Sequence, residues 1–327
     1  MRKSISCSAP AKVILFGEHF VVGGQPALVT AVDRRAYVRC VERDEGILVR
    51  SGSSYIFRKN GRTVDYSSPA DIVSLRPYSV MAETVLEDVG VEKGVEIVVE
   101  SEIPRGAGLG SSAAVAVAGS KAILSLLNQE ADLESVVRYA MKSEKIVHGR
   151  PSGIDIRVAA SGGTILYSTP SDWRRLELGW SPRLIILDTG VRRPTGRVVR
   201  SVLSYARSEP YLFEELIQIY REVLSTSLEA LNRGDLKTVG RCMDINHILL
   251  RALGVSSNVI ERAIDFLRGL EVYGAKLTGA GLGGCVIAVM DEGRMDSALT
   301  HIRDMYNGSW LASTSCEGVR VERSGGA

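Results

Sequence analysis

The sequence of 327 residues is short of cysteine and has no two cysteines in a Cys-x-x-Cys spacing. An odd number of widely spaced cysteines argues against a disulfide scaffold and against a zinc ribbon. The pattern fits a reducing compartment, so we expect a cytoplasmic protein. The five residues are Cys7, Cys40, Cys242, Cys285 and Cys316.

The chain also lacks an apolar run of the roughly 18–20 residues that span a bilayer. Its N-terminal segment reaches charged residues before any stretch long enough for a signal peptide. The 40 basic residues barely exceed the 38 acidic ones, which gives no argument for nucleic acid or an anionic membrane as partner. Since 45% of the residues are hydrophobic, a packed core is expected and wholesale disorder is excluded.

Hydrophobic periodicity predicts an α+β protein of two lobes. Short β-rich runs fill the first third, and two helices follow, over 111–127 and over 133–148, the second capped by Asp132. After a strand-rich stretch, three helices are expected between 211 and 270, then strand, glycine turn, strand, helix and strand. We place the lobes at 1–178 and 179–327.

The most specific feature is a glycine- and serine-rich segment between an expected strand and an expected helix. Its glycines permit positive φ, which lets backbone N–H groups approach an anion, and its serines begin a helix whose positive dipole end favours phosphate. It is neither a Walker A loop nor a Rossmann fingerprint. A tight turn is the alternative, but this composition favours phosphate binding. The segment comprises Pro104, Arg105, Gly106, Ala107, Gly108, Leu109, Gly110, Ser111 and Ser112.

A second glycine segment, over 278–286, formally matches both the Rossmann pattern and the glycine loop of protein kinases. A strand is expected after it where a Rossmann site needs a helix. Too few residues follow for the other elements of a protein kinase. We therefore predict a hairpin-like glycine turn that closes over a ligand, with a plain hairpin as the alternative.

Three charged residues are candidates for chemistry. Lys12 precedes four apolar residues, so it is either a buried, paired lysine or a lysine whose stem lies along a strand end. Glu144 continues the apolar stripe of the 133–148 helix, and Asp155 begins an apolar run. Two such acids near a lysine and a phosphate loop fit magnesium-dependent phosphoryl transfer. A helix cap and a structural salt bridge are the alternative.

Together these segments resemble the GHMP kinase superfamily and, within it, the mevalonate kinase family. The resemblance covers most of the chain in the family's order and spacing, and Gly23 is one small departure beyond the first motif. It rests on AKVILFGEHFVV (11–22), SEIPRGAGLGSSAA (101–114), EKIVHGRPSGID (144–155) and KLTGAGLGGCV (276–286).

The resemblance implies an N-terminal lobe like ribosomal protein S5 domain 2 and a ferredoxin-like C-terminal lobe. It implies ATP-dependent phosphorylation of the C5 hydroxyl of mevalonate to 5-phosphomevalonate in isoprenoid synthesis, with Mg²⁺, and a homodimer is common in the family. A sister kinase is the alternative, acting on phosphomevalonate, the mevalonate 3-hydroxyl, homoserine or galactose.

The resemblance also implies site residues. ATP phosphates would lie on the segment 104–112 with Ser101 at the nucleotide's edge, and Mg²⁺ would be bound by Ser112 and Glu144. Asp155 would be the catalytic base with Lys12 beside it, and we expect this pair to orient and polarise the hydroxyl. Arg192, Arg193 and Arg197 are candidates by position for a carboxylate. Mevalonate would contact Glu18, His19, Thr195 and Ala280.

Overall fold

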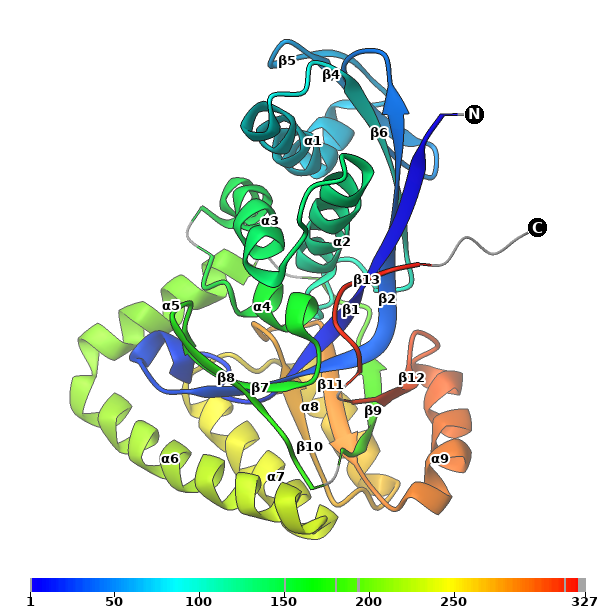
Figure 1. Cartoon of the computed structure of the whole chain (residues 1–327). Coiled ribbons are helices and arrows are strands. Elements are labelled where there is room, and N and C mark those ends of the chain that lie inside the picture. The colour runs from blue at the N-terminus through cyan, green and yellow to red at the C-terminus, as the bar shows by residue number, and fades with distance from the viewer. Residues whose placement is uncertain (1, 150, 180, 193–194, 315, 323–327) are drawn as a thin grey trace.

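The computed structural model describes residues 2–149, 151–179, 181–192, 195–314 and 316–322, without the side chains at 148 and 195. Strands and helices alternate irregularly, as an α+β class requires, and the expected class is confirmed (Figure 1). In chain order the elements are β1 (Ser4–Phe16), η1 (Phe20–Gly23), β2 (Ala27–Arg43), β3 (Ile47–Ser51), β4 (Ser54–Lys59), β5 (Arg62–Tyr66), α1 (Pro69–Val89), β6 (Gly94–Ser101), α2 (Ser111–Leu126), α3 (Leu133–His148), α4 (Ile154–Ser161), β7 (Thr164–Thr169), β8 (Asp172–Leu176), β9 (Arg183–Asp188), α5 (Thr195–Ser208), α6 (Pro210–Arg233), α7 (Leu236–Ala252), α8 (Asn258–Gly269), β10 (Gly274–Thr278), β11 (Cys285–Val289), α9 (Glu292–Met305), β12 (Trp310–Ser313) and β13 (Arg320–Val321).

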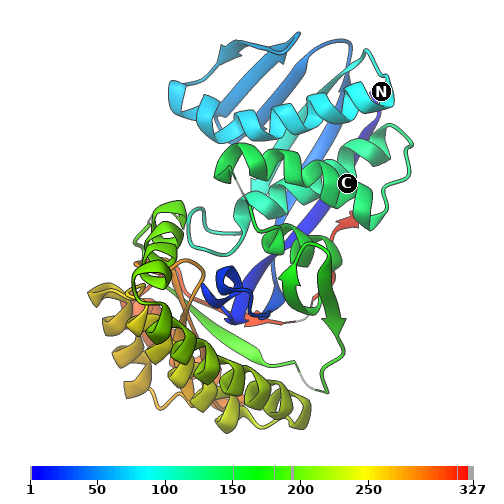
Figure 2. The same ribbon diagram turned by 90° about the vertical axis from the view of Figure 1, so that its left-hand side faces the viewer.

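The N-terminal lobe is a large sheet with helices on one face. Its strands follow the order β13-β1-β2-β6-β3-β4-β5 within the described residues, and β7 and β8 extend it beside β2. Figure 2 shows α1, α2 and α3 in front of this sheet. Helix α2 packs on β1 and β2 and is buried along most of its length, which explains its alanine-rich sequence.

The C-terminal lobe is the ferredoxin-like half of the protein. Its sheet has the order β10-β11-β9-β12 among the described strands. Helices α7 and α8 pack on β10 and β11, whereas α9 packs on β9 and β12. The first sheet ends at β8 and the second begins at β9, and we propose the lobe boundary between 178 and 179 in this connection. Strand β13 returns to the first sheet, where it pairs with β1.

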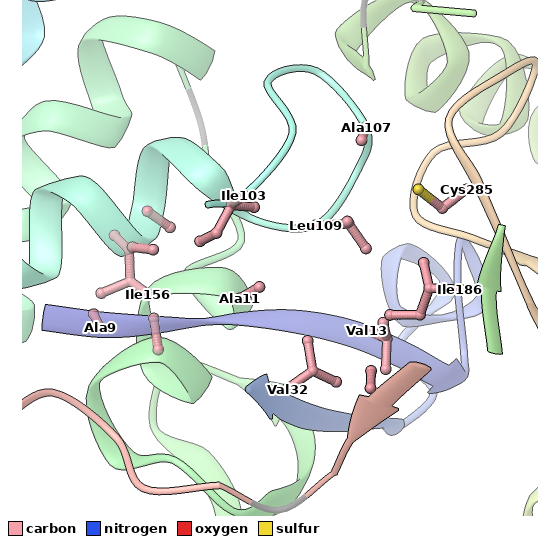
Figure 3. Packing of buried hydrophobic residues seen from close by; sticks show 14 of the residues in the cluster. Ala9, Ala11, Val13, Val32, Ile103, Ala107, Leu109, Ile156, Ile186 and Cys285 are labelled. Atoms are coloured by element: carbon pink, nitrogen blue, oxygen red, sulfur yellow. The ribbon is translucent and has the colours of Figure 1, made fainter. Parts of the chain in front are cut away.

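One hydrophobic cluster passes from one lobe to the other. Figure 3 shows Val13 of β1 and Leu109 of the glycine segment beside Ile186 of β9 and Cys285 of β11. All four side chains are at most 1% exposed. The end of β1 and the glycine segment therefore lie at the junction between the lobes, which brings residues of both lobes to one place.

Most of the expected elements are confirmed, and the differences have local causes. Helix α3 spans 133–148 with Asp132 as its cap, and the three helices between 211 and 270 are α6, α7 and α8. The sequence patterns predict short β-rich runs in the first third, whereas β1 is one continuous strand of 13 residues with a bulge after Pro10. They predict no helix over 69–89, where α1 includes Pro77 in its interior. Among the described residues, no helix has the length and apolar character that crossing a membrane requires.

Candidate active site

Lys12 and Asp155 form an ion pair where β1 meets the start of α4. The Nζ atom of Lys12 lies 3.1 Å from Oδ1 of Asp155, and the lysine side chain is 5% exposed. Lys12 is therefore a buried, paired lysine, because a lysine that reached solvent along a strand end would leave its ammonium accessible. Asp155, with a side chain 34% exposed, lies in the first turn of α4. The expectation that these two groups meet is correct.

The glycine segment 104–112 ends beside this ion pair. Gly106, Gly108 and Gly110 all have positive φ, which a side chain would make unfavourable. At Gly110, which caps α2, a Cβ atom would lie 3.0 Å from Cγ of Lys12 and 3.7 Å from Oδ2 of Asp155. The backbone amides at the start of α2 thus lie next to the charged pair, and amides at such a helix terminus can bind an anion.

The glycine turn after β10 lies against the same segment. Strands β10 and β11 pair antiparallel with Thr278 opposite Cys285, so the turn is the hairpin that the sequence predicts. A Cβ atom at Gly108 would lie 3.4 Å from the Thr278 carbonyl oxygen, and one at Gly284 would lie 2.9 Å from the Ala107 carbonyl oxygen. The backbones of the two glycine segments can approach this closely because these positions lack side chains.

Arg192 fixes the glycine segment from the other lobe. Its Nη1 and Nη2 atoms each lie 2.6 Å from a carboxylate oxygen of Asp188, and its Nε donates to the Arg105 carbonyl at 2.8 Å. Arg192 is one of the arginines that we consider for a substrate carboxylate. Three of its N–H groups are used within the protein, and a contact with a substrate carboxylate stays a prediction for Arg192.

Glu18 and His19 follow β1 and are both buried, 1% and 5% exposed. The Nε2 atom of His19 lies 2.8 Å from the carbonyl oxygen of Ala280, so the first motif and the glycine turn are in contact. Because a carbonyl only accepts, Nε2 carries the hydrogen. Burial lowers the pKa of His19, which leaves its Nδ1 as an acceptor.

Glu18 also forms an ion pair that the sequence analysis missed. Lys276 of β10 donates to the Glu18 carboxylate, and both side chains are 0% exposed. The available signal was a lysine in the middle of a strand whose neighbours are apolar, because such a charge needs a partner. Thr278 was missed as well: its hydroxyl oxygen accepts from the Ile14 amide at 3.0 Å and joins β10 to β1.

The remaining candidates lie on α2, on α3, at the end of β6 and at the start of α5. Glu144 is 4% exposed on α3, which packs against α2, where Ser112 lies in the first turn. The Ser101 hydroxyl oxygen accepts from the Ile103 amide at 3.1 Å. Thr195 is the first residue of α5, but its side chain lies outside the described residues, as does Arg193.

The candidate metal ligands on the packed helices α2 and α3 are oxygen atoms, those of the buried Glu144 carboxylate and of the Ser112 hydroxyl. These are ligands of the kind that Mg²⁺ takes when it binds through one or two protein groups and substrate phosphates. No cluster of three or more His, Cys, Asp or Glu residues suited to a metal occurs in the described part of the chain. The described residues therefore fit a metal ion that is bound partly by protein oxygens and partly by the phosphates of a nucleotide. They do not surround a metal ion with protein ligands alone.

Comparison with known families gives matches in both lobes. Residues 77–163 match the family described as the GHMP kinases N terminal domain, and residues 227–308 match that described as GHMP kinases C terminal. The mevalonate kinase of Aeropyrum pernix is 36% identical over 98% of this chain and 99% of its own length. The mevalonate kinase of Pyrococcus abyssi is 34% identical over the same shares.

Solved structures agree with these matches. The crystal structure of L. major mevalonate kinase in complex with R-mevalonate superposes with a TM-score of 0.82 and 27% sequence identity, covering 97% of this chain and 98% of that one. Sequence similarity and fold similarity both extend over nearly the whole length of the protein. The chain therefore belongs to the mevalonate kinase family of the GHMP kinases.

Proposed function

We propose that the protein transfers the γ-phosphoryl group of ATP to the C5 hydroxyl of mevalonate, giving 5-phosphomevalonate and ADP in isoprenoid synthesis. The observation that carries the proposal is the Lys12–Asp155 pair, 3.1 Å apart, against the glycine-rich start of α2. Phosphoryl transfer requires a site for the phosphates, which the helix terminus offers. It also requires groups that position the alcohol, which the neighbouring carboxylate and ammonium offer. Membership of the mevalonate kinase family supports mevalonate as the alcohol.

In this proposal each group of residues has a separate task. The segment 104–112 binds the ATP phosphates through backbone amides, with Ser101 at the edge of the nucleotide. Asp155 accepts a hydrogen bond from the C5 hydroxyl and orients it, and Lys12 fixes the carboxylate and polarises the hydroxyl. Contacts with the rest of mevalonate come from Glu18, His19, Thr195 and Ala280.

Magnesium is the metal that these residues fit. Glu144 and Ser112 would bind it together with the nucleotide phosphates, and when bound it would neutralise the charge that develops on them.

We also propose a cytoplasmic location, which the five free cysteines support, since structural disulfides are rare in reducing compartments. The homodimer stays a proposal from the resemblance, and light scattering at several protein concentrations tests it.

The test of the function is ADP release with MgATP and a panel of alcohols. We expect turnover with mevalonate to exceed turnover with phosphomevalonate, homoserine and galactose, and we expect the product to carry its phosphate on C5 by ³¹P and ¹³C NMR. Greater turnover with another alcohol would overturn the choice of substrate. A product phosphorylated on the 3-hydroxyl would overturn the choice of reacting group.

A further inference from the structure

Among the described residues, Lys276 is the most completely buried charge that the proposed mechanism does not use. It lies in the middle of β10, a strand in which every residue is buried, and its side chain is 0% exposed. Its ammonium donates to the Glu18 carboxylate, to the Leu277 carbonyl at 2.8 Å and towards the Ile14 carbonyl at 3.5 Å. All three hydrogen atoms of the ammonium therefore have acceptors, and two of these acceptors belong to the other lobe.

Glu18 uses only one of its oxygens in this arrangement. Its Oε2 atom is enclosed and accepts no hydrogen bond from a described residue, and neither does Nδ1 of the neighbouring His19. A buried acceptor without a partner is costly in the protein alone. Two such acceptors on adjacent residues, one of them within the electrostatic influence of Lys12, suit a ligand that brings hydrogen-bond donors.

Stability alone does not account for the ion pair. Replacing a buried pair by apolar side chains of similar volume is often neutral or stabilising, because both charges have lost their hydration. What the pair supplies, and an apolar pair does not, is a carboxylate in the interior with one oxygen bound to an ammonium and one oxygen without a partner among the described residues. An ionised carboxylate accepts hydrogen bonds, whereas a protonated one donates as well.

We propose that Lys276 is a positioning residue for the alcohol substrate: its ammonium keeps the Glu18 carboxylate charged and fixed by Oε1, so that Oε2 accepts a hydrogen bond from a hydroxyl group of that substrate. This rests on the proposed function in one respect, namely that Glu18 contacts the alcohol. Nothing in the proposed roles of the ATP-binding residues depends on Lys276.

The charged groups around Glu18 and Lys276 determine how removal of the Lys276 ammonium affects the protonation of Glu18. Burial raises the pKa of Glu18, and the ammonium of Lys276 is the strongest influence against that shift, ahead of Lys12. The other titratable groups that interact with the pair are Tyr220 of α6, His19 after β1 and His247 of α7. Without the ammonium of Lys276, Glu18 therefore becomes easier to protonate as the pH falls.

The first experiment compares Lys276→Met with the wild-type enzyme in the ADP-release assay. We expect the KM for mevalonate to rise by about ten- to a hundredfold, since a hydrogen bond to a charged group is lost, while the KM for ATP changes by less than about threefold. The acid limb of the kcat/KM profile for mevalonate moves to higher pH. Lys142→Met, an exposed lysine on α3, is the matched control and leaves all of these values unchanged.

A structural role without positioning gives a different result. In that case Lys276→Met lowers the melting temperature but leaves the mevalonate KM and the acid limb as in the wild type, and this outcome overturns the proposal. If wild-type enzyme turns over another alcohol better than mevalonate, the proposed function fails by itself. The same variants measured with that preferred alcohol then decide the role of Lys276 separately.

A double variant covers the case in which one unpaired buried charge prevents folding. Glu18→Gln with Lys276→Met leaves neither charge, so we expect it to fold, to bind ATP normally and to have the raised mevalonate KM. Where Glu18→Gln alone also folds, adding Lys276→Met raises the mevalonate KM no further, because Lys276 acts through Glu18. A double variant with the wild-type mevalonate KM, or effects that multiply, would contradict the proposal.

Discussion

At the scale of single residues, the end of β1 depends on one glycine. Gly17 has a φ of 109°, and a Cβ atom there would lie 2.6 Å from Cα of Ala27 and 2.7 Å from the Tyr220 hydroxyl. That hydroxyl donates to the Pro26 carbonyl at 2.5 Å, so it has little freedom to move away. The turn at Gly17 directs Glu18 and His19 towards β10 and the glycine turn, and no other residue permits it without strain.

Asp155 is the residue whose substitution tests the chemistry. In Asp155→Asn the amide keeps the size of the side chain but cannot accept a proton from the alcohol, so we expect kcat to fall by about a hundred- to ten-thousandfold. The KM for ATP should change little. The measurement is steady-state ADP release, with Asp265→Asn, an exposed position on α8, as the control. An unchanged kcat would show that Asp155 takes no part in the reaction.

At the scale of elements, the glycine segment is a loop held in place by groups outside it. It has no regular structure between β6 and α2, and it is attached by a backbone contact with β1, by a hydrogen bond from Arg105 to Ser51 of β3, and by a side chain of the other lobe. The Lys12 amide donates to the Leu109 carbonyl at 3.1 Å, and Arg192 donates to the Arg105 carbonyl. A loop attached to both lobes is expected to respond to the loss of either attachment.

Arg192→Ala tests this attachment. We expect the KM for ATP to rise about tenfold, because the loop loses a charged hydrogen bond and part of the order that phosphate binding needs. Arg192→Lys should restore little, since a lysine cannot bind Asp188 with two nitrogens and reach the carbonyl with a third. Arg207→Ala, exposed in the last turn of α5, is the control. Equal ATP KM values in all three variants would exclude this role.

At the scale of the whole molecule, the two lobes share one core and bury charged or titratable groups between their elements. His19 lies between β1 and the glycine turn. In α7, the Nε2 atom of His247 lies 3.1 Å from the Glu261 carboxylate. Burial lowers the pKa of both histidines below the usual 6.5. The folded protein therefore keeps two neutral imidazoles that the unfolded chain protonates more readily.

This difference predicts how stability depends on pH. Above pH 6.5 both states carry neutral imidazoles, and as the pH falls below 6.5 only the unfolded chain gains protons, so the free energy of unfolding decreases. The loss is at most about 1.4 kcal/mol per pH unit for each histidine. Thermal unfolding between pH 8 and 5 measures it, and His247→Gln should reduce the slope. The same slope in this variant and the wild type would contradict the assignment to His247.

The sequence by itself determined the elements whose causes are local and the motifs whose order is specific. Helix α3 with its Asp132 cap follows from periodicity and from one side chain bonding to an amide three residues ahead. The lysine before an apolar run and the acid at the start of another each indicated a charge that needs a partner, whereas the pairing of Lys12 with Asp155 followed from the resemblance to the family.

The tertiary structure alone decided which distant groups meet. Glu18 and Lys276 are 258 positions apart in sequence, and Arg192 reaches a loop 87 positions away. No local pattern selects one buried acid for one buried lysine, since each needs only some opposite charge nearby. The choice depends on how β10 packs beside the end of β1, and that arrangement arises from burial of the shared core between the two lobes.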